Sequence, residues 1–182
     1  MIEQKKPRYF SKRFAILIVC TFIVMTLIVY ASAVSSYEYA LISERGRTQA
    51  NNTYQEIQTR RQTITALDLF LNNSLLGLPL AVPIFGFLWF GKILINTGLT
   101  LGVLAFSFNV TPATYLLASY MPIGFIETLA YSILSTESFM LLHATFKKKL
   151  RLRLRHATWK ALTLYTMLLL FGAVIEILII RS

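Results

Sequence analysis

The chain has 182 residues, of which 55% are hydrophobic, and its mean hydropathy is +0.60. This composition excludes a typical soluble domain and predicts an integral membrane protein. A net charge of +10 would suggest nucleic-acid binding in a soluble protein. In a membrane protein we expect these charges mainly to orient the spans, and we do not expect a nucleic-acid partner.

Five apolar blocks follow one another along the chain, and a helix needs about 20 residues to cross a bilayer core. The blocks cover residues 14–34, 69–90, 93–108, 115–142 and 161–180. They predict an all-α fold, a polytopic transmembrane helix bundle of about five spans in a single membrane domain over residues 1–182. The first block is longer than a usual signal-peptide core, so we interpret it as an uncleaved anchor.

The fourth block is longer than one crossing requires, and it contains Pro122 and Gly124. Proline removes a backbone donor and disfavours helix at the preceding residue, while glycine loosens the next turn. We therefore expect a broken or strongly tilted helix around Pro122 and Gly124.

Basic residues near the ends of spans are retained on the cytoplasmic side, and this rule predicts the orientation. With the N-terminus inside and five spans, the inner segments hold 13 of the 18 Lys and Arg residues. Trp and Tyr residues also lie near the predicted ends of the spans, as expected at a membrane interface. We predict a multi-pass protein of the cell membrane with a cytoplasmic N-terminus and a C-terminus outside.

Two polar segments connect the predicted spans. The inner loop, 143–160, is basic, and we expect it to bind anionic lipid headgroups, with a cytosolic partner as the alternative. Its expected contact residues are Lys147, Lys148, Lys149, Arg151, Arg153 and Arg155. The outer segment, 35–66, pairs Glu56 with Arg60 at a helical spacing in its second half. It is either a solvated loop or a docking surface for an extracytoplasmic or membrane protein partner.

Residue types that form catalytic and metal sites are sparse in the sequence. Cys20 is the single cysteine, and His143 and His156 have no carboxylate at ligand spacing. The sequence contains no phosphate-binding loop, nucleophile elbow or zinc-protease motif. We predict a protein that is not an enzyme and that needs no cofactor or metal.

Small residues inside the apolar blocks indicate close helix packing. Gly98 and Gly102 form a GxxxG pair, a spacing that allows two helices to approach closely. We expect this pair to pack within the chain, with a homo-oligomer interface as the alternative.

Glu127 is the most unusual residue of the fourth block, because a carboxylate near the bilayer centre costs at least about 2.5 kcal/mol. On an unbroken helix it would share a small and polar stripe with Gly124, Tyr131 and Ser138. If the helix breaks at Pro122, Glu127 would instead lie in the first turn of a half-helix, where a negative charge is favourable. Its role is either structural or that of a proton or cation site, as in transporters with discontinuous helices.

Three short motifs occur in order between residues 69 and 146. They are Asn72-Asn73, the NTGLTLG segment with Gly98 and Gly102, and the PIGFIETLA segment with Pro122, Gly124, Glu127 and Ala130. In these motifs the chain resembles the stage II sporulation protein M (SpoIIM) family. Ile123 stands where that family has a histidine.

The resemblance implies a non-enzymatic membrane scaffold or complex subunit. In spore-forming bacteria such a protein recruits or anchors partner proteins, wall hydrolases among them. The alternative that we draw from the residues themselves is a small permease or transporter subunit that uses intramembrane Glu127, with Glu137 on the same polar path.

Overall fold

The computed structural model describes residues 12–83, 85–119 and 123–181, and the regular structure in these ranges is entirely helical. The predicted all-α fold is therefore confirmed. The elements are α1 (Lys12–Ile42), α2 (Glu44–Thr63), α3 (Ala66–Gly77), the 3₁₀ turn η1 (Leu78–Ala81), α4 (Phe85–Ser107), α5 (Pro112–Ser119), α6 (Phe125–Phe146), α7 (Leu150–Arg153), the π-helical turn η3 (Leu154–Thr158) and α8 (Trp159–Arg181).

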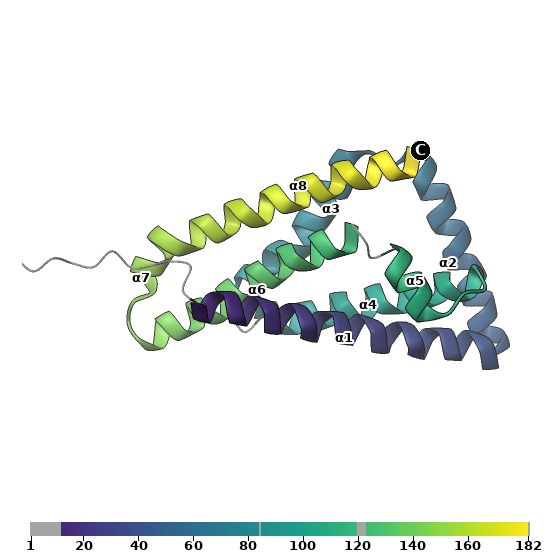
Figure 1. The fold of residues 1–182 in the computed structure, drawn as a ribbon, viewed down its shortest axis with the longest axis horizontal. Helices are drawn as coiled ribbons and strands as arrows, with labels where there is room; N and C mark the ends of the chain where they lie inside the picture. The colour runs from purple at the N-terminus through teal and green to yellow at the C-terminus, as the bar shows by residue number, and fades with distance from the viewer. Residues whose placement is uncertain (1–11, 84, 120–122, 182) are drawn as a thin grey trace, which may run out of the picture.

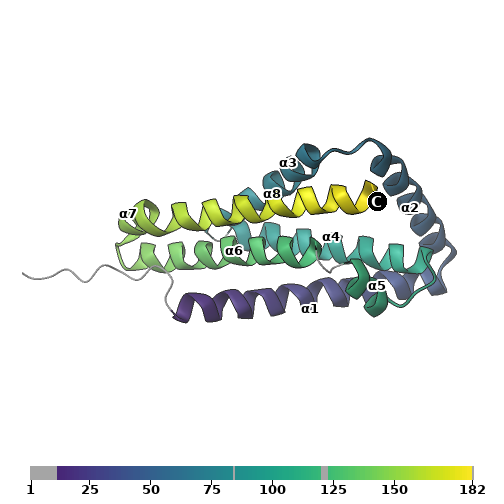
Figure 2. The ribbon, with the colours of Figure 1, turned by 45° about the horizontal axis from the view of Figure 1, so that its top comes forward.

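Four long helices, α1, α4, α6 and α8, form an elongated bundle, and α2 crosses one of its ends (Figures 1 and 2). α3 lies beside α8, and α6 packs between α1 and α8. The start of α1 and the turn from α6 to α7 lie at the end far from α2, while the C-terminus lies at the α2 end. We call these the basic end and the α2 end. α1 and α8 therefore begin at the basic end and finish at the α2 end.

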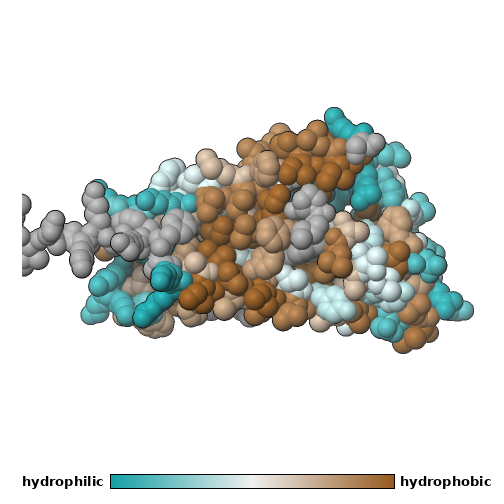
Figure 3. Space-filling model, viewed as in Figure 1, coloured by the Kyte–Doolittle hydropathy of each residue, from teal (hydrophilic) through white to brown (hydrophobic). Residues whose placement is uncertain are grey.

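Three helical segments of the described chain are long and apolar enough to span a membrane, whereas the sequence predicts about five spans. They are Lys12–Ile42, Trp89–Ser107 and Leu150–Arg181. Large apolar side chains are exposed on their outer faces, and Figure 3 shows an apolar belt between two polar ends. Examples are Ile16, Val19, Leu27, Met167, Phe171 and Leu178. Such a belt is what a lipid environment requires of the outer surface. α6 is not among the three segments, because two glutamates and several hydroxyl side chains lower its hydropathy.

The predicted blocks 69–90 and 93–108 do not form two long helices. Pro79 lies in the first turn of η1, where the chain leaves α3, and α4 begins only at Phe85. Lys92, which separates the two blocks in the sequence, lies inside α4 with its ammonium 5.4 Å from the Trp89 ring. The first block is thus divided between α3, η1 and α4, and the second is the later part of α4. Prolines, and not the lysine, divide this region.

The fourth predicted block also forms two helices in place of one. α5 ends at Ser119 and α6 begins at Phe125, with Gly124 as its N-cap residue. Pro122 lies outside the described residues. The two helices flank the segment for which the sequence predicts a break.

α2 and α3 are separate helices because their ends are capped. Ser43 caps α2, and its hydroxyl accepts a hydrogen bond from the backbone of Gly46. Thr65 and Asp68 form a reciprocal capping box at the start of α3, with a 3.0 Å bond from the Thr65 amide to the Asp68 carboxylate. The outer segment is therefore helical over most of its length, and α2 is its main exposed surface.

Gly98 and Gly102 lie where α4 packs against α1. A Cβ atom at Gly98 would lie 2.4 Å from the Val29 carbonyl oxygen, and one at Gly102 would lie 2.1 Å from the Ala33 carbonyl oxygen. The Ser36 hydroxyl donates a 2.9 Å hydrogen bond to the Leu99 carbonyl across the same contact. The GxxxG pair thus forms an intramolecular helix contact that tolerates no side chain.

Candidate functional site

A cavity of about 460 Å³ lies within the bundle and is lined by residues of α1, α2, α3, α4, α5, α6 and α8. Most of its wall is apolar and includes Leu94, Leu101, Leu104 and Ile123. The polar residues of the lining are Arg61, Asn73, Thr97, Tyr115, Glu127, Thr128, Tyr131 and Glu176. An apolar cavity of this size with a few convergent polar groups is typical of a small-molecule site.

Glu127 reaches this cavity from the first turn of α6. Ile123 and Gly124 are π-helical and lead directly into α6, so Glu127 lies in the first α-helical turn that follows them. The positive end of the helix dipole favours a carboxylate there. The side-chain amide of Asn73 donates a short hydrogen bond to Glu127 Oε1. Residues 120–122, where the sequence predicts the break, lie outside the described residues, so both geometries considered from the sequence stay predictions.

Two tyrosine side chains donate hydrogen bonds to the backbone of Asn73. The hydroxyls of Tyr131 and Tyr165 donate to the Asn73 carbonyl oxygen at 3.4 and 3.3 Å. Gly77, one turn further along α3, has no room for a side chain, because a Cβ atom would lie 1.9 Å from the Tyr165 hydroxyl. α3 is therefore fixed against α6 and α8 at the level of Glu127, and the Asn73 amide is pre-positioned for the carboxylate.

A second carboxylate, Glu176, reaches the same cavity from α8. Gly172 lies against Glu127, since a Cβ atom added there would be 3.8 Å from Glu127 Cγ. Glu176 is one turn further along α8 and therefore on the same face. The sequence contains Gly172 and Glu176 at this spacing, but only the packing of α8 on α6 brings them to Glu127.

Arg61 lies at the mouth of the cavity, near the C-terminal end of α2. A smaller hollow of about 370 Å³ is lined by Gln58, Arg61, Gln62, Ile179 and Ile180, and the last two isoleucines and Arg61 also line the main cavity. The Arg61 guanidinium interacts electrostatically with Glu176. The two hollows therefore adjoin each other at these three residues, near the α2 end of the bundle.

Glu137, the other acid of α6, has a different environment. It is 1% exposed and forms an ion pair with Arg153, whose Nε donates to Glu137 Oε1 at 2.9 Å. The Thr158 hydroxyl donates to the same oxygen at 2.8 Å. The sequence predicts that Arg153 contacts lipid. In the structure, its ion pair with Glu137 instead joins the end of α7 to α6. Glu137 does not line the cavity.

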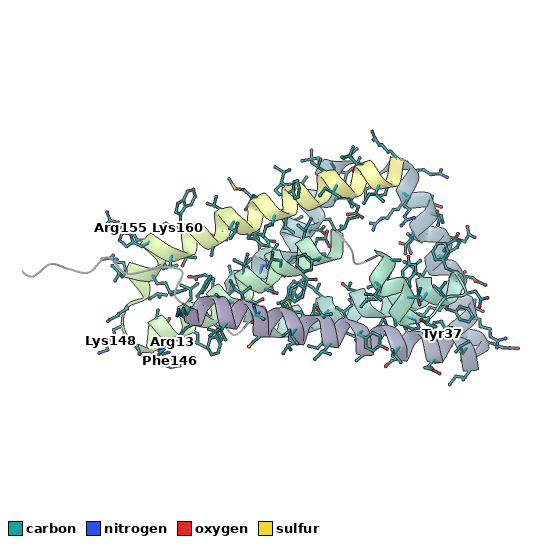
Figure 4. The ribbon with its side chains drawn as sticks, viewed as in Figure 1. Arg13, Tyr37, Phe146, Lys148, Arg155 and Lys160 are labelled. Carbon is teal, nitrogen blue, oxygen red and sulfur yellow. The ribbon has the colours of Figure 1, made fainter. Side chains whose placement is uncertain are left out.

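The basic end carries the other residues of the predicted inner loop. Lys147, Lys148, Lys149, Arg151 and Arg155 are all exposed. Figure 4 shows Lys148 and Arg155 at this end, together with Arg13 from the start of α1 and with Phe146. Phe146 is 79% exposed, and Trp159 nearby in the chain is 66% exposed. The basic side chains and the aromatic rings thus share one end of the bundle.

Most of the motif residues lie either at the cavity or at the contact between α1 and α4. Asn73, Gly124 and Glu127 line the cavity, whereas Gly98 and Gly102 lie between α1 and α4. Two further motif residues have other surroundings: Ala130 is fully buried in the core, and Asn72 is exposed and donates to Asn73 Oδ1 at 3.4 Å. Within the described residues, no group of three or more His, Cys, Asp and Glu side chains could hold a metal ion.

No family model matches the chain, and neither the curated proteins nor the solved structures yield a match. The resemblance to the SpoIIM family therefore rests on the three sequence motifs alone.

Proposed function

We propose that this protein is a small permease or transporter subunit of the cell membrane, which admits a solute from the α2 end into the acidic cavity. The observation that carries the proposal is the pair of carboxylates, Glu127 and Glu176, in one recess inside a bundle of apolar helices. Ionisable residues within a membrane are costly and usually line a substrate or ion path. Discontinuous helices with a half-helix terminus at the site, as at Glu127, are common in transporters.

The contrast with Glu137 supports this role. A glutamate that serves only to hold helices together is expected to be neutralised by a partner, as Glu137 is by Arg153. Glu127 has an amide donor from Asn73, and its acidic neighbour Glu176 faces the same cavity. Two acids in one apolar recess favour the entry of a positively charged or proton-donating group.

Cysteine accessibility tests whether the cavity admits solute. Native Cys20 is replaced by Ser, and Thr97, which lines the cavity, is replaced by Cys. Ala130→Cys is the matched control, because Ala130 is fully buried and does not line the cavity. A membrane-impermeant thiol reagent added on the α2 side should modify position 97 at least tenfold faster than position 130. Equal rates would contradict a solute-accessible cavity.

The second candidate is a scaffold of the SpoIIM type, with α2 as its docking helix. α2 is a polar helix of 20 residues, and Arg45, Gln55, Glu56 and Arg60 are exposed on it. In the proposed orientation, with the N-terminus and the basic end in the cytoplasm, α2 faces outward and is the largest polar surface there. Crosslinking from positions 45 and 56 in native membranes should then capture a defined extracytoplasmic partner. If these positions capture nothing while flux through the cavity is measurable, the permease proposal stands alone.

A further inference from the structure

Charged side chains of both signs line the cavity: the two carboxylates and one guanidinium group. Glu127 comes from the first turn of α6 and Glu176 from the C-terminal part of α8, whereas Arg61 comes from α2, which crosses the end of the bundle. Of the described residues that line the cavity, Arg61 is the only cation. An anion that entered would pass Arg61 and then meet two acids, so the interior selects against negative charge.

The chemistry of the residues that line the cavity determines which kind of cation it can bind. An alkaline-earth ion such as Ca²⁺ or Mg²⁺ prefers six or more oxygen ligands, whereas nine of the nineteen described residues that line the cavity are Leu, Ile or Val. An ammonium group needs only a few acceptors for its three N–H donors, and two carboxylates can supply them. An alkyl body attached to that group would lie against the apolar walls and leave little buried polar surface unpaired.

We propose that the cavity binds an amphipathic organic cation, with its ammonium group between Glu127 and Glu176, and that Arg61 is the internal cation which this ligand replaces beside Glu176. This ligand assignment rests on the proposed solute-accessible cavity. Arg61 is exposed, lines both hollows and interacts electrostatically with Glu176. An entering ammonium group must therefore compete with the guanidinium for the outer acid.

The chain offers a matched control for this competition. Arg60 is the neighbouring residue of α2, carries the same charge and is exposed, but it does not line either hollow. Arg61→Gln removes the competing cation, whereas Arg60→Gln removes an equal charge from the same helix outside the recess. A long-range effect of charge on the ligand would appear in both variants, and direct competition only in the first.

The experiment measures protection of a cysteine at position 97 in the Cys20→Ser background, purified in nanodiscs of zwitterionic lipid. A neutral maleimide reports the labelling rate in the presence of ethyl-, butyl- or hexylammonium chloride, with the alcohols of equal chain length as uncharged controls. Butylammonium should slow the labelling at least threefold, and butanol should leave it unchanged. Glu127→Gln and Glu176→Gln should each abolish the protection, and Arg61→Gln should lower the half-protective concentration at least threefold relative to Arg60→Gln.

Contrary results would overturn different parts of the proposal. Equal protection by butanol and butylammonium would overturn the cation assignment. If no ammonium ion protects position 97 while it still labels faster than position 130, the ligand class is wrong and the proposed permease remains. Equal effects of Arg61→Gln and Arg60→Gln would overturn the role of Arg61. If Glu127→Gln does not fold, Glu176→Gln and the ammonium-against-alcohol comparison in the unmodified cavity still decide the proposal.

Discussion

Alanine substitutions at two glycines of α4 test the close packing of α4 on α1. Gly91 has no neighbouring atom within 4 Å of an added Cβ. Gly91→Ala should therefore stabilise the protein by about 0.5–1 kcal/mol, because alanine loses less backbone entropy than glycine in a helix. At Gly102 the same atom would lie 2.1 Å from both the Ala33 carbonyl oxygen and Ser36 Oγ.

The cost at Gly102 follows from these contacts. Overpacking of a close helix contact costs about 1–3 kcal/mol. The displaced Ser36 also loses its 2.9 Å hydrogen bond to the Leu99 carbonyl, a contribution of about 1 kcal/mol. With the gain in backbone entropy common to both variants, Gly102→Ala should be about 2–4 kcal/mol less stable than Gly91→Ala.

Equilibrium unfolding in mixed micelles by titration with dodecyl sulfate provides the measurement, with Trp89 and Trp159 as fluorescent reporters. Both tryptophans lie in spanning helices, so their signals follow loss of the bundle. Equal stabilities of Gly91→Ala and Gly102→Ala would refute the packing of α1 on α4 described above. A more stable Gly102→Ala would refute it more strongly, since it would mean that the position has free space.

Three further predictions concern other parts of the chain. Arg153→Gln leaves Glu137 buried without its counter-ion and should cost about 3–5 kcal/mol in the same unfolding assay, whereas Arg153→Met combined with Glu137→Met should restore most of that loss. The hydrogen bonds from Thr65 hold the pKa of Asp68 below its usual range. The cap of α3 should therefore be intact at neutral pH and lose stability as the pH falls through about 4, a dependence that Asp68→Asn should remove in circular-dichroism titrations. Lys148→Glu should weaken binding to vesicles that contain anionic lipid, measured by flotation at low and high salt, and leave binding to zwitterionic vesicles unchanged.

Local chemistry made several features of this fold predictable. The composition indicated an all-helical protein with apolar helices long enough to span a membrane, and the structure has both features. Hydropathy alone was misleading between residues 69 and 108, because apolar residues continue through the turn that Pro79 introduces at the end of α3. A window of apolar residues detects burial in lipid but does not detect where the backbone loses its helical hydrogen bonds.

The cavity could not be predicted because its lining residues come from seven helices that are distant in the sequence. Asn73 is 54 residues from Glu127, and no local pattern connects them. Arg61 belongs to a polar helix that the sequence places outside the spans, and it reaches the cavity only because α2 crosses the end of the bundle. In the same way, Arg153 looks like one of several basic surface residues until the hairpin of α6 and α8 brings it to Glu137.

The two glutamates of α6 have different environments. Glu137 accepts two donors from Arg153 and one from Thr158, so its charge is neutralised within the fold. Glu127 lies at the start of the same helix and lines the cavity together with a second acid, Glu176, and with Arg61. Glu137 has a charged partner within the fold, Arg153, whereas the hydrogen-bond partner of Glu127, Asn73, is neutral. A cationic ligand would therefore pair with Glu127, towards the α2 end. This asymmetry along one helix is the physical reason to look for solute binding at Glu127 and for stability at Glu137.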